Sequence, residues 1–293
     1  MRLSEERTSV FIHAFFICYA LVCIIPFMIV VSASFTSVED LSFHGFSIIP
    51  PNFDVSAYQY LFKNPMIYVR AYGVTIFITI VGTFLSVLIM SMVGYALARP
   101  TFRLKNIVTW FLFFPTLFSG GLTSSYIINT QVLHLTDSIW SMILPGLINV
   151  FHIFIIRTFF KQLPDGLFEA AKIDGAGEWK IYTSIALRLS KPVLATVAFL
   201  GVLSRWNEWY NAMLYIRTAT KYPLQYLLQR MMNNIQELLN AMTNAPAIVL
   251  TEQIPGENLR MALLVVCIGP IMLIFPFFQK YFSKGMTVGA VKG

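Results

Sequence analysis

Residues 72–96 read YGVTIFITIVGTFLSVLIMSMVGYA and contain no charged side chain. An α-helix rises about 1.5 Å per residue, so about 20 consecutive apolar residues are enough to cross a hydrocarbon core of about 30 Å. A run of this length and composition therefore predicts a transmembrane helix.

Five further apolar runs flank this stretch, at residues 10–31, 107–118, 139–156, 192–211 and 261–278. Only 12% of the chain is charged and 57% is hydrophobic, whereas soluble domains are about 25% charged. The first run exceeds the apolar core of about 7–15 residues that a signal peptide carries, so we interpret it as a membrane anchor. We expect an all-α, polytopic membrane protein with six transmembrane helices, forming a single transmembrane domain over residues 1–293.

The basic residues indicate the orientation of the chain. Lys and Arg gather at both ends and in the segments after the second and fourth runs, and the connection between the third and fourth runs has none. Because cytoplasmic loops carry an excess of Lys and Arg, both termini are predicted to be cytoplasmic. Two long segments, 32–70 and 212–260, then lie outside, and residues 224–242 of the second have the pattern of an amphipathic helix.

The segment after the fourth run is the most informative hydrophilic stretch. Residues 157–192 read RTFFKQLPDGLFEAAKIDGAGEWKIYTSIALRLSKP. We expect a short helix over 166–172 with Asp165 as its N-cap, a break at Gly175 and Gly177, and a second helix over about 178–189. The small Ala170 and Ala171 would let another surface approach the first helix closely.

The same segment carries a recognisable motif. The spacing of Glu169-Ala170-Ala171, Gly175 and Ile185-Ala186-Leu187 resembles the "EAA" signature of permease subunits of binding-protein-dependent ABC importers. The six-run layout, the residues WNEW at 206–209 and the tail GMTVGAVKG at 285–293 extend the resemblance over the chain. It is most similar to carbohydrate-uptake permeases, especially those that import oligosaccharides from complex polysaccharides. Arg188 stands where the family pattern usually has proline, which puts the shape of this elbow in question.

The resemblance implies a type I ABC importer permease fold in the bacterial cytoplasmic (inner) membrane. Residues 157–191 would be the coupling loop, and the residues matching the family's coupling positions are Glu169, Ala170, Ala171, Asp174, Gly175, Ile185 and Leu187. The implied partners are a second homologous permease subunit, two ATP-binding subunits, an extracytoplasmic solute-binding protein, membrane lipid and an oligosaccharide substrate. The chain would be a transport subunit and not an enzyme, with ATP and Mg bound by the partner.

Polar and aromatic residues in or beside the apolar runs are candidates for the substrate path, because intramembrane polarity is costly and usually faces a bundle interior. They are Asn149, His152, Trp206, Asn207, Glu208 and Tyr210. Asn149 and His152 would share one helix face. Other interpretations stay open: aromatic residues at a helix end form interfacial belts, a lone histidine is often a packed residue, and Arg205 and Glu208 have the spacing of an ion pair within a helix.

An ion-coupled secondary transporter is the main alternative. Such transporters usually carry intramembrane carboxylates and internal repeats, and neither is evident here. No phosphate-binding loop or hydrolase motif appears, and Cys18, Cys23 and Cys267 lie in apolar runs without metal-site spacing. The basic residues are dispersed, which argues against a nucleic-acid partner. These alternatives leave the motif in 157–191 unexplained, so an importer permease is the expectation.

Overall fold

The computed structural model describes residues 2–118, 120–244 and 256–290 of the chain, and the described part is helical without strands. Three helices are long: α1 (Arg2–Ser34), α4 (Pro65–Ala98) and α14 (Glu257–Ala290). Within them Ile12–Ser34, Pro65–Ala98 and Glu257–Pro276 are long and apolar enough to cross a membrane. The all-α class and the first, second and sixth predicted runs are thereby confirmed as helical.

Shorter helices connect these three. They are α2 (Val38–His44), α3 (Ser56–Leu61), α5 (Lys105–Leu117), α6 (Gly121–Ile127), η1 (Ile128–Val132), η2 (Ile139–Met142), α7 (Val150–Lys161), α8 (Asp165–Ile173), α9 (Glu178–Ile181), η3 (Tyr182–Ala186), α10 (Leu187–Leu189), α11 (Lys191–Trp206), α12 (Tyr210–Tyr215), η4 (Ala219–Lys221) and α13 (Leu224–Asn244). The predicted amphipathic helix at 224–242 corresponds to α13.

Two bent helix pairs are candidates for further spans. Lys105–Leu117 pairs with Gly121–Val132, and Glu178–Leu189 pairs with Lys191–Trp206, so the described residues contain up to five candidate spans if each bent pair counts as one. The third predicted run lies in the first pair. The fifth, 192–211, begins in the second pair, but the predicted single helix is interrupted at 207–209, between α11 and α12. Helix α5 alone has 13 residues, which gives about 20 Å of length, short of a hydrocarbon core of about 30 Å.

The prediction of one helix over 139–156 is wrong. The chain forms the short η2, turns through 143–149, and begins α7 only at Val150. Pro145 has no N–H to donate within a helix, and Asn149 Oδ1 accepts a hydrogen bond from His152 N at 3.2 Å, which makes Asn149 the N-cap of α7. The apolar composition of 139–156 suggested one continuous helix. The proline at 145 and the N-cap at 149 instead divide the stretch into two helices.

The chain divides into two compact units. Unit 1 comprises Met1–Met66 and Leu228–Pro270. In it the end of α1 is fixed to the segment that follows: Ser34 Oγ and the Tyr58 hydroxyl are 2.8 Å apart, and the Phe35 ring stacks on Phe53 and Tyr58 at centroid distances of 5.1 and 4.9 Å. Ser37 caps α2 by accepting from Asp40 N. These contacts order the segment between α1 and α4.

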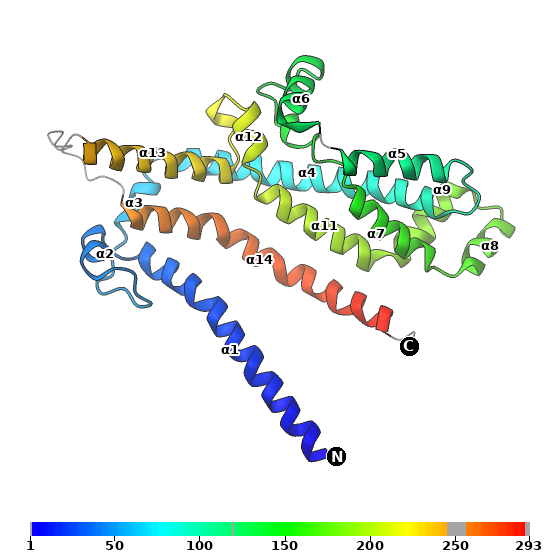
Figure 1. Cartoon of the computed structure of the whole chain (residues 1–293), viewed down its shortest axis with the longest axis horizontal. Helices are drawn as coiled ribbons and strands as arrows, with labels where there is room; N and C mark the ends of the chain where they lie inside the picture. Colours follow the sequence, from blue (N-terminus) through cyan, green and yellow to red (C-terminus); the bar gives the residue numbers. More distant parts are fainter. Residues whose placement is uncertain (1, 119, 245–255, 291–293) are drawn as a thin grey trace. The chain divides into compact units, whose positions relative to one another are not determined.

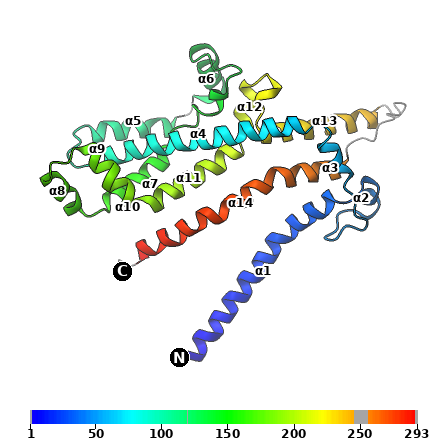
Figure 2. The same cartoon turned by 180° about the vertical axis from the view of Figure 1, so that it is seen from behind.

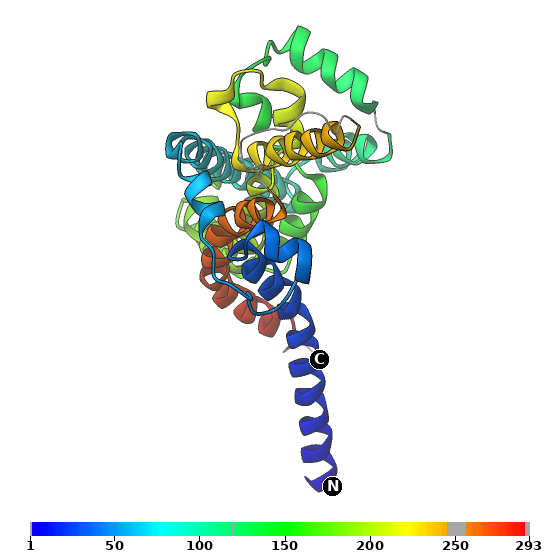
Figure 3. The same ribbon diagram turned by 90° about the vertical axis from the view of Figure 1, so that its left-hand side faces the viewer.

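Unit 2 comprises Ile67–Leu227 and Ile271–Gly293 and contains the candidate site. Helices α5, α7 and α11 lie along the C-terminal half of α4, with α8 and α9 near its end (Figures 1 and 2). Their shared core consists of Met90, Tyr95, Leu97, Ile153, Ile156, Phe160, Phe168, Ile181, Tyr182, Ala186, Val193 and Val197. Helices α6 (green) and α12 (yellow) lie on the same side of α4 (cyan) in Figures 1 and 3, and the Tyr126 and Tyr215 rings stack there at 5.7 Å.

Candidate functional site

The segment 157–191 forms the two short helices that the sequence predicts. The first is α8, but its N-cap is Pro164 and no side chain caps it, so the expectation that Asp165 is the cap is wrong. Asp165 is instead the first helical residue, where its negative charge interacts favourably with the helix dipole. The second helix runs through α9, η3 and α10 from Glu178 to Leu189 with a π-helical stretch inside it.

A tight turn separates these helices. Gly175 has a φ of +75°, in the left-handed region that favours glycine. Gly175 N donates to Lys172 O at 3.0 Å and Ala176 N donates to Ala171 O at 2.9 Å, which satisfies carbonyls at the end of α8. Gly177 then caps α9 with extended backbone. The predicted break at Gly175 and Gly177 is confirmed.

The loop is clamped onto the end of α4 by a polar cluster around Glu178. The Tyr95 hydroxyl donates to Glu178 Oε2 at 2.7 Å, and Lys172 Nζ and Arg99 Nε lie 3.1 and 3.6 Å from its carboxylate oxygens. The Arg99 guanidinium also lies 4.4 Å from the centroid of the Phe168 ring, which is 4% exposed. Sequence reasoning missed these residues, because pairing across 83 positions is not visible in a local pattern.

The predicted coupling residues divide into two groups. Glu169, Ala170, Asp174 and Gly175 are exposed, whereas Ala171, Ile185 and Leu187 are half-buried and pack against the core of unit 2. Large apolar side chains accompany the exposed group on the same short helices: Leu167, Ile173 and Trp179 are exposed, Ile173 by 85%. The loop thus has an inner face that anchors it and an outer face that is free in the described part of the chain.

The elbow with Arg188 in place of proline is sharply bent. Residues 178–189 and Lys191–Trp206 meet at 80°. Pro192 lies in the first turn of α11, where its missing N–H costs no helical hydrogen bond. Arg188 is exposed at the end of α10. The absence of proline at position 188 therefore does not straighten the entry to α11.

Two of the predicted path residues come together at a small cavity. Asn149 and His152 line a cavity of about 60 Å³ bounded by α4, α7, α11 and the turn before α7. They meet because Asn149 caps α7, and not because both lie within one helix as the sequence analysis expected. Ser86, Ser204 and Arg205 line the same cavity.

The other four path candidates lie elsewhere. Trp206 is 3% exposed, with its ring 6.5 Å from that of Tyr72. Asn207 is the C-cap of α11, and its Nδ2 donates to Leu203 O at 2.8 Å. Glu208 lies in the break between α11 and α12 and accepts from N and Nδ2 of Asn211, in the first turn of α12, at 2.8 and 2.9 Å. Tyr210 is exposed at the start of α12. These four do not line the cavity that holds Asn149 and His152.

Arg205 is a polar residue of this cavity that the list of path candidates missed. The i,i+3 spacing suggested an ion pair with Glu208, yet the Nη2 atom of Arg205 donates to Ser86 Oγ at 2.5 Å and to Gly146 O at 3.0 Å. Gly82 leaves room for it, since a Cβ at that position would collide with the Arg205 side chain. The available signal in the sequence was a positively charged residue in an apolar run. The i,i+3 spacing, however, indicated Glu208 as its partner instead of Ser86 and Gly146.

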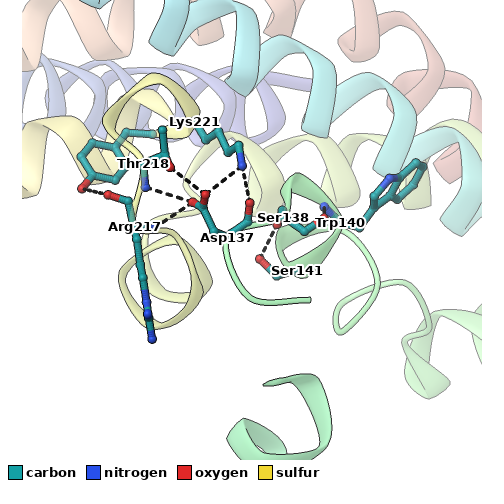
Figure 4. Close-up of polar contacts among 8 residues, drawn as sticks. Asp137, Ser138, Trp140, Ser141, Arg217, Thr218 and Lys221 are labelled. Atoms are coloured by element: carbon teal, nitrogen blue, oxygen red, sulfur yellow. Dashed lines mark hydrogen bonds and ion pairs between the residues drawn. The ribbon is translucent and has the colours of Figure 1, made fainter. Parts of the chain in front are cut away.

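A second polar cluster joins η2 to the loop after α12 (Figure 4). Asp137 Oδ1 accepts from Arg217 N and Thr218 N at 3.0 and 2.9 Å, and Oδ2 accepts from Thr218 Oγ1 and Lys221 Nζ at 2.6 and 2.9 Å. These bonds hold the pKa of Asp137 well below its ordinary value, with the Thr218 hydroxyl the largest contributor and Lys221 the next. One carboxylate therefore orders the loop at 217–221.

Comparison with known proteins identifies the kind of molecule that carries these features. The family model for the binding-protein-dependent transport system inner membrane component matches residues 9–288. Protein LplC of Bacillus subtilis (strain 168) is 38% identical over 93% of this chain and 90% of its own length. The polygalacturonan/rhamnogalacturonan transport system permease protein YtcP of the same organism is 35% identical over 99% of this chain and 100% of its own.

A solved structure has the same fold. It is a chain of a bacterial ABC transporter involved in the import of the acidic polysaccharide alginate, with a TM-score of 0.80, 26% identity, and coverage of 95% of this chain and 98% of that chain. The loop with its EAA motif, the apolar helices and these matches over nearly the full length agree. The chain belongs to the family of inner membrane components of binding-protein-dependent transport systems, as a permease subunit of an ABC transporter.

Proposed function

We propose that this chain forms half of the translocation path of an ATP-driven importer for an oligosaccharide. A second, homologous permease subunit would supply the other half, two ATP-binding subunits the ATP and Mg sites, and an extracytoplasmic binding protein the sugar. The names of YtcP and of the alginate transporter support a polysaccharide-derived substrate. Membrane lipid surrounds the exposed apolar faces of its spans, and both termini lie in the cytoplasm.

We further propose that residues 157–191 receive the motion of the ATP-binding subunit. The observation that carries this is the two-sided construction of the loop. Glu169 and Ala170 are exposed on α8, while Phe168 of the same helix is buried under Arg99 and Lys172 pairs with Glu178. A push on the exposed face of α8 is therefore passed to the end of α4 through short polar contacts and a packed ring.

Charge reversal in this loop tests the proposal. We expect Glu169→Lys to lower ATP-dependent uptake of a labelled hydrolysate of polygalacturonan and rhamnogalacturonan about tenfold. A tenfold change corresponds to the loss of about 1.4 kcal/mol, which is the size of one well-placed charged contact. Gly175→Leu should act similarly, because a branched side chain disfavours a φ of +75°.

Both variants should reach the membrane at normal levels but recover less of the ATP-binding subunit on purification. Glu39→Lys, a charge reversal at an exposed position of α2, serves as the matched control. Normal uptake by both loop variants would contradict the coupling role. Failure of the wild-type importer to take up any component of the hydrolysate would contradict the proposed substrate class.

A further inference from the structure

Arg205 is a buried cation at the depth of a membrane span. Arg205 is 6% exposed, and it donates to Ser86 of α4. Ser86 lies twelve residues before the end of α4 at Ala98, which places it about 18 Å along the helix axis from that end. A charged group at such depth is costly and is by default a candidate for function.

The positive charge is not neutralised by the residues that the structure describes. No ion pair joins Arg205 to a carboxylate there, and Arg205 Nε is buried without a hydrogen-bond partner among them. Glu208, three residues along the chain, uses its oxygens on Asn211 and acts on Arg205 only through space. Two neutral acceptors, Ser86 Oγ and Gly146 O, hold the guanidinium in place. A buried cation held by neutral groups attracts an anion.

The surroundings form a built cavity. It has a volume of about 60 Å³ and is lined by polar groups of Ser86, Asn149, His152 and Ser204, with no acidic residue among its lining. Thr83 also borders it, and its buried Oγ1 has no partner in the described chain. Since a cavity needs only about 10–15 Å³ of accessible volume to hold one water, this space has room for a group of the size of a carboxylate.

Two glycines border the Arg205 side chain. A Cβ on Gly82 would collide with this side chain, whereas a Cβ on Gly201 would be in ordinary van der Waals contact with Arg205 Nη1 at 3.5 Å. The two glycines lie on different helices, α4 and α11. The sequence thus provides a charged group, fixed acceptors that orient it, and the room that it needs.

We propose that Arg205 is a specificity-determining residue that binds a carboxylate of an acidic sugar during passage, with the sugar ring outside the cavity. A planar guanidinium fits a carboxylate better than it fits a sugar hydroxyl, because both bonds are charge-assisted. The inference rests on the proposed function and narrows its substrate to uronate-containing oligosaccharides. YtcP and the alginate transporter are both named for polysaccharides that contain such acids.

The test uses the complete importer, with its binding protein, in proteoliposomes. The probe is a pool of partly methyl-esterified oligogalacturonides, and mass spectrometry of the imported fraction gives the ratio of unesterified to esterified trimers. Because one binding protein serves every variant, a change in this ratio reports on the permease. We expect Arg205→Gln to lower the ratio about tenfold relative to the wild type.

Two further variants separate recognition from structure. Arg205→Lys keeps the charge without the planar fork, so its ratio should lie between those of the wild type and Arg205→Gln. Arg217→Gln removes one exposed arginine that contacts Asp137 only through its backbone N–H, and its ratio should equal that of the wild type (Figure 4).

Three results would overturn the proposal: an unchanged ratio in Arg205→Gln, an equal fall of all imported species, or loss of all import in both Arg205 variants of an assembled complex. The last two would assign Arg205 a structural role. A wild-type importer that takes up no member of the pool would instead contradict the proposed import of such oligosaccharides, on which this inference depends.

Discussion

Single carboxylates fix two separate parts of unit 2. Glu178 ties the loop 157–191 to the end of α4 through Tyr95 and Arg99 and also pairs with Lys172 within the loop. Asp137 ties the segment before η2 to residues 217–221. Both accept from groups far away in the sequence. Hydrogen bonds to a charged group stabilise a structure more than neutral ones do. Substitution of either carboxylate alone is therefore expected to release its loop.

Replacing Asp137 with Asn should release the loop at 217–221. The amide removes the charge that Lys221 pairs with and weakens the bonds from Arg217 N and Thr218 N. We expect hydrogen exchange of these two amides to accelerate about tenfold, which corresponds to about 1.4 kcal/mol, at the low end for a charged acceptor because the site is partly exposed. Thr109→Ala is a suitable control, since its hydroxyl bonds only within α5. Unchanged exchange in Asp137→Asn would show that the loop is ordered by other contacts.

The same loop should respond to pH with a defined sign. Its hydrogen bonds lower the pKa of Asp137 in the folded protein, so their stabilisation is fully present above the unfolded value of about 3.9 and is lost as pH falls towards the lower folded value. Exchange at Thr218, corrected for its intrinsic pH dependence, should therefore show no change between neutral pH and about pH 5 and rise below about pH 4. A rise that begins near neutral pH would point to another group.

Helix α4 organises unit 2 at the scale of elements. Its buried face alternates small residues with larger ones, and Gly94 lets α7 approach: a Cβ there would lie 2.9 Å from Ile156 Cγ2 and 3.3 Å from Arg157 N. Ile156 is fully buried in the core of unit 2. Gly73, on the same helix, has no atom within 4 Å of such a Cβ.

This pair provides a matched comparison. Gly94→Ala should destabilise the purified complex in detergent by about 1–3 kcal/mol, because overpacking a close helix contact forces neighbours to shift. Gly73→Ala should leave it unchanged or stabilise it by up to about 1 kcal/mol through helix propensity. Thermal unfolding measured by circular dichroism distinguishes the two. Equal behaviour of the two variants would mean that α4 and α7 are not in close contact in the membrane.

Elements were predictable from the sequence where one signal dominates. Long uncharged runs gave α1, α4 and α14, and the glycines at 175 and 177 gave the turn after α8. The prediction of one helix over 139–156 failed because hydrophobicity alone does not indicate the turns at 143–149, where Pro145 lacks an N–H and Asn149 caps α7. The cavity was half predicted. Asn149 and His152 were named, but Arg205 was considered only as an alternative ion-pair partner of Glu208, because sequence spacing shows neighbours within a helix and not partners on other helices.

At the scale of the whole molecule, the charge pattern predicts an orientation that the family alone does not supply. Alkaline phosphatase fused after Gly293 should be inactive, because that enzyme needs an oxidising compartment and we expect this end in the cytoplasm. A fusion after Asn52, in the predicted outer segment, should be active. Green fluorescent protein at both positions should give the reverse pattern. An active phosphatase after Gly293 would overturn the topology and with it the cytoplasmic position of residues 157–191.

The hydroxyls buried along α4 bear on how the protein is assembled during synthesis. Thr75 accepts from Leu224 N, Ser86 binds Arg205 and Leu147, and Ser91 contacts Tyr182, so every partner is translated after α4 has left the ribosome. Until then such hydroxyls can bond to carbonyls of their own helix, as Ser91 does to Leu88 O. Membrane insertion of α4 thus precedes its docking, and defects at these positions will appear as chains that enter the bilayer normally but are later cleared by proteolysis.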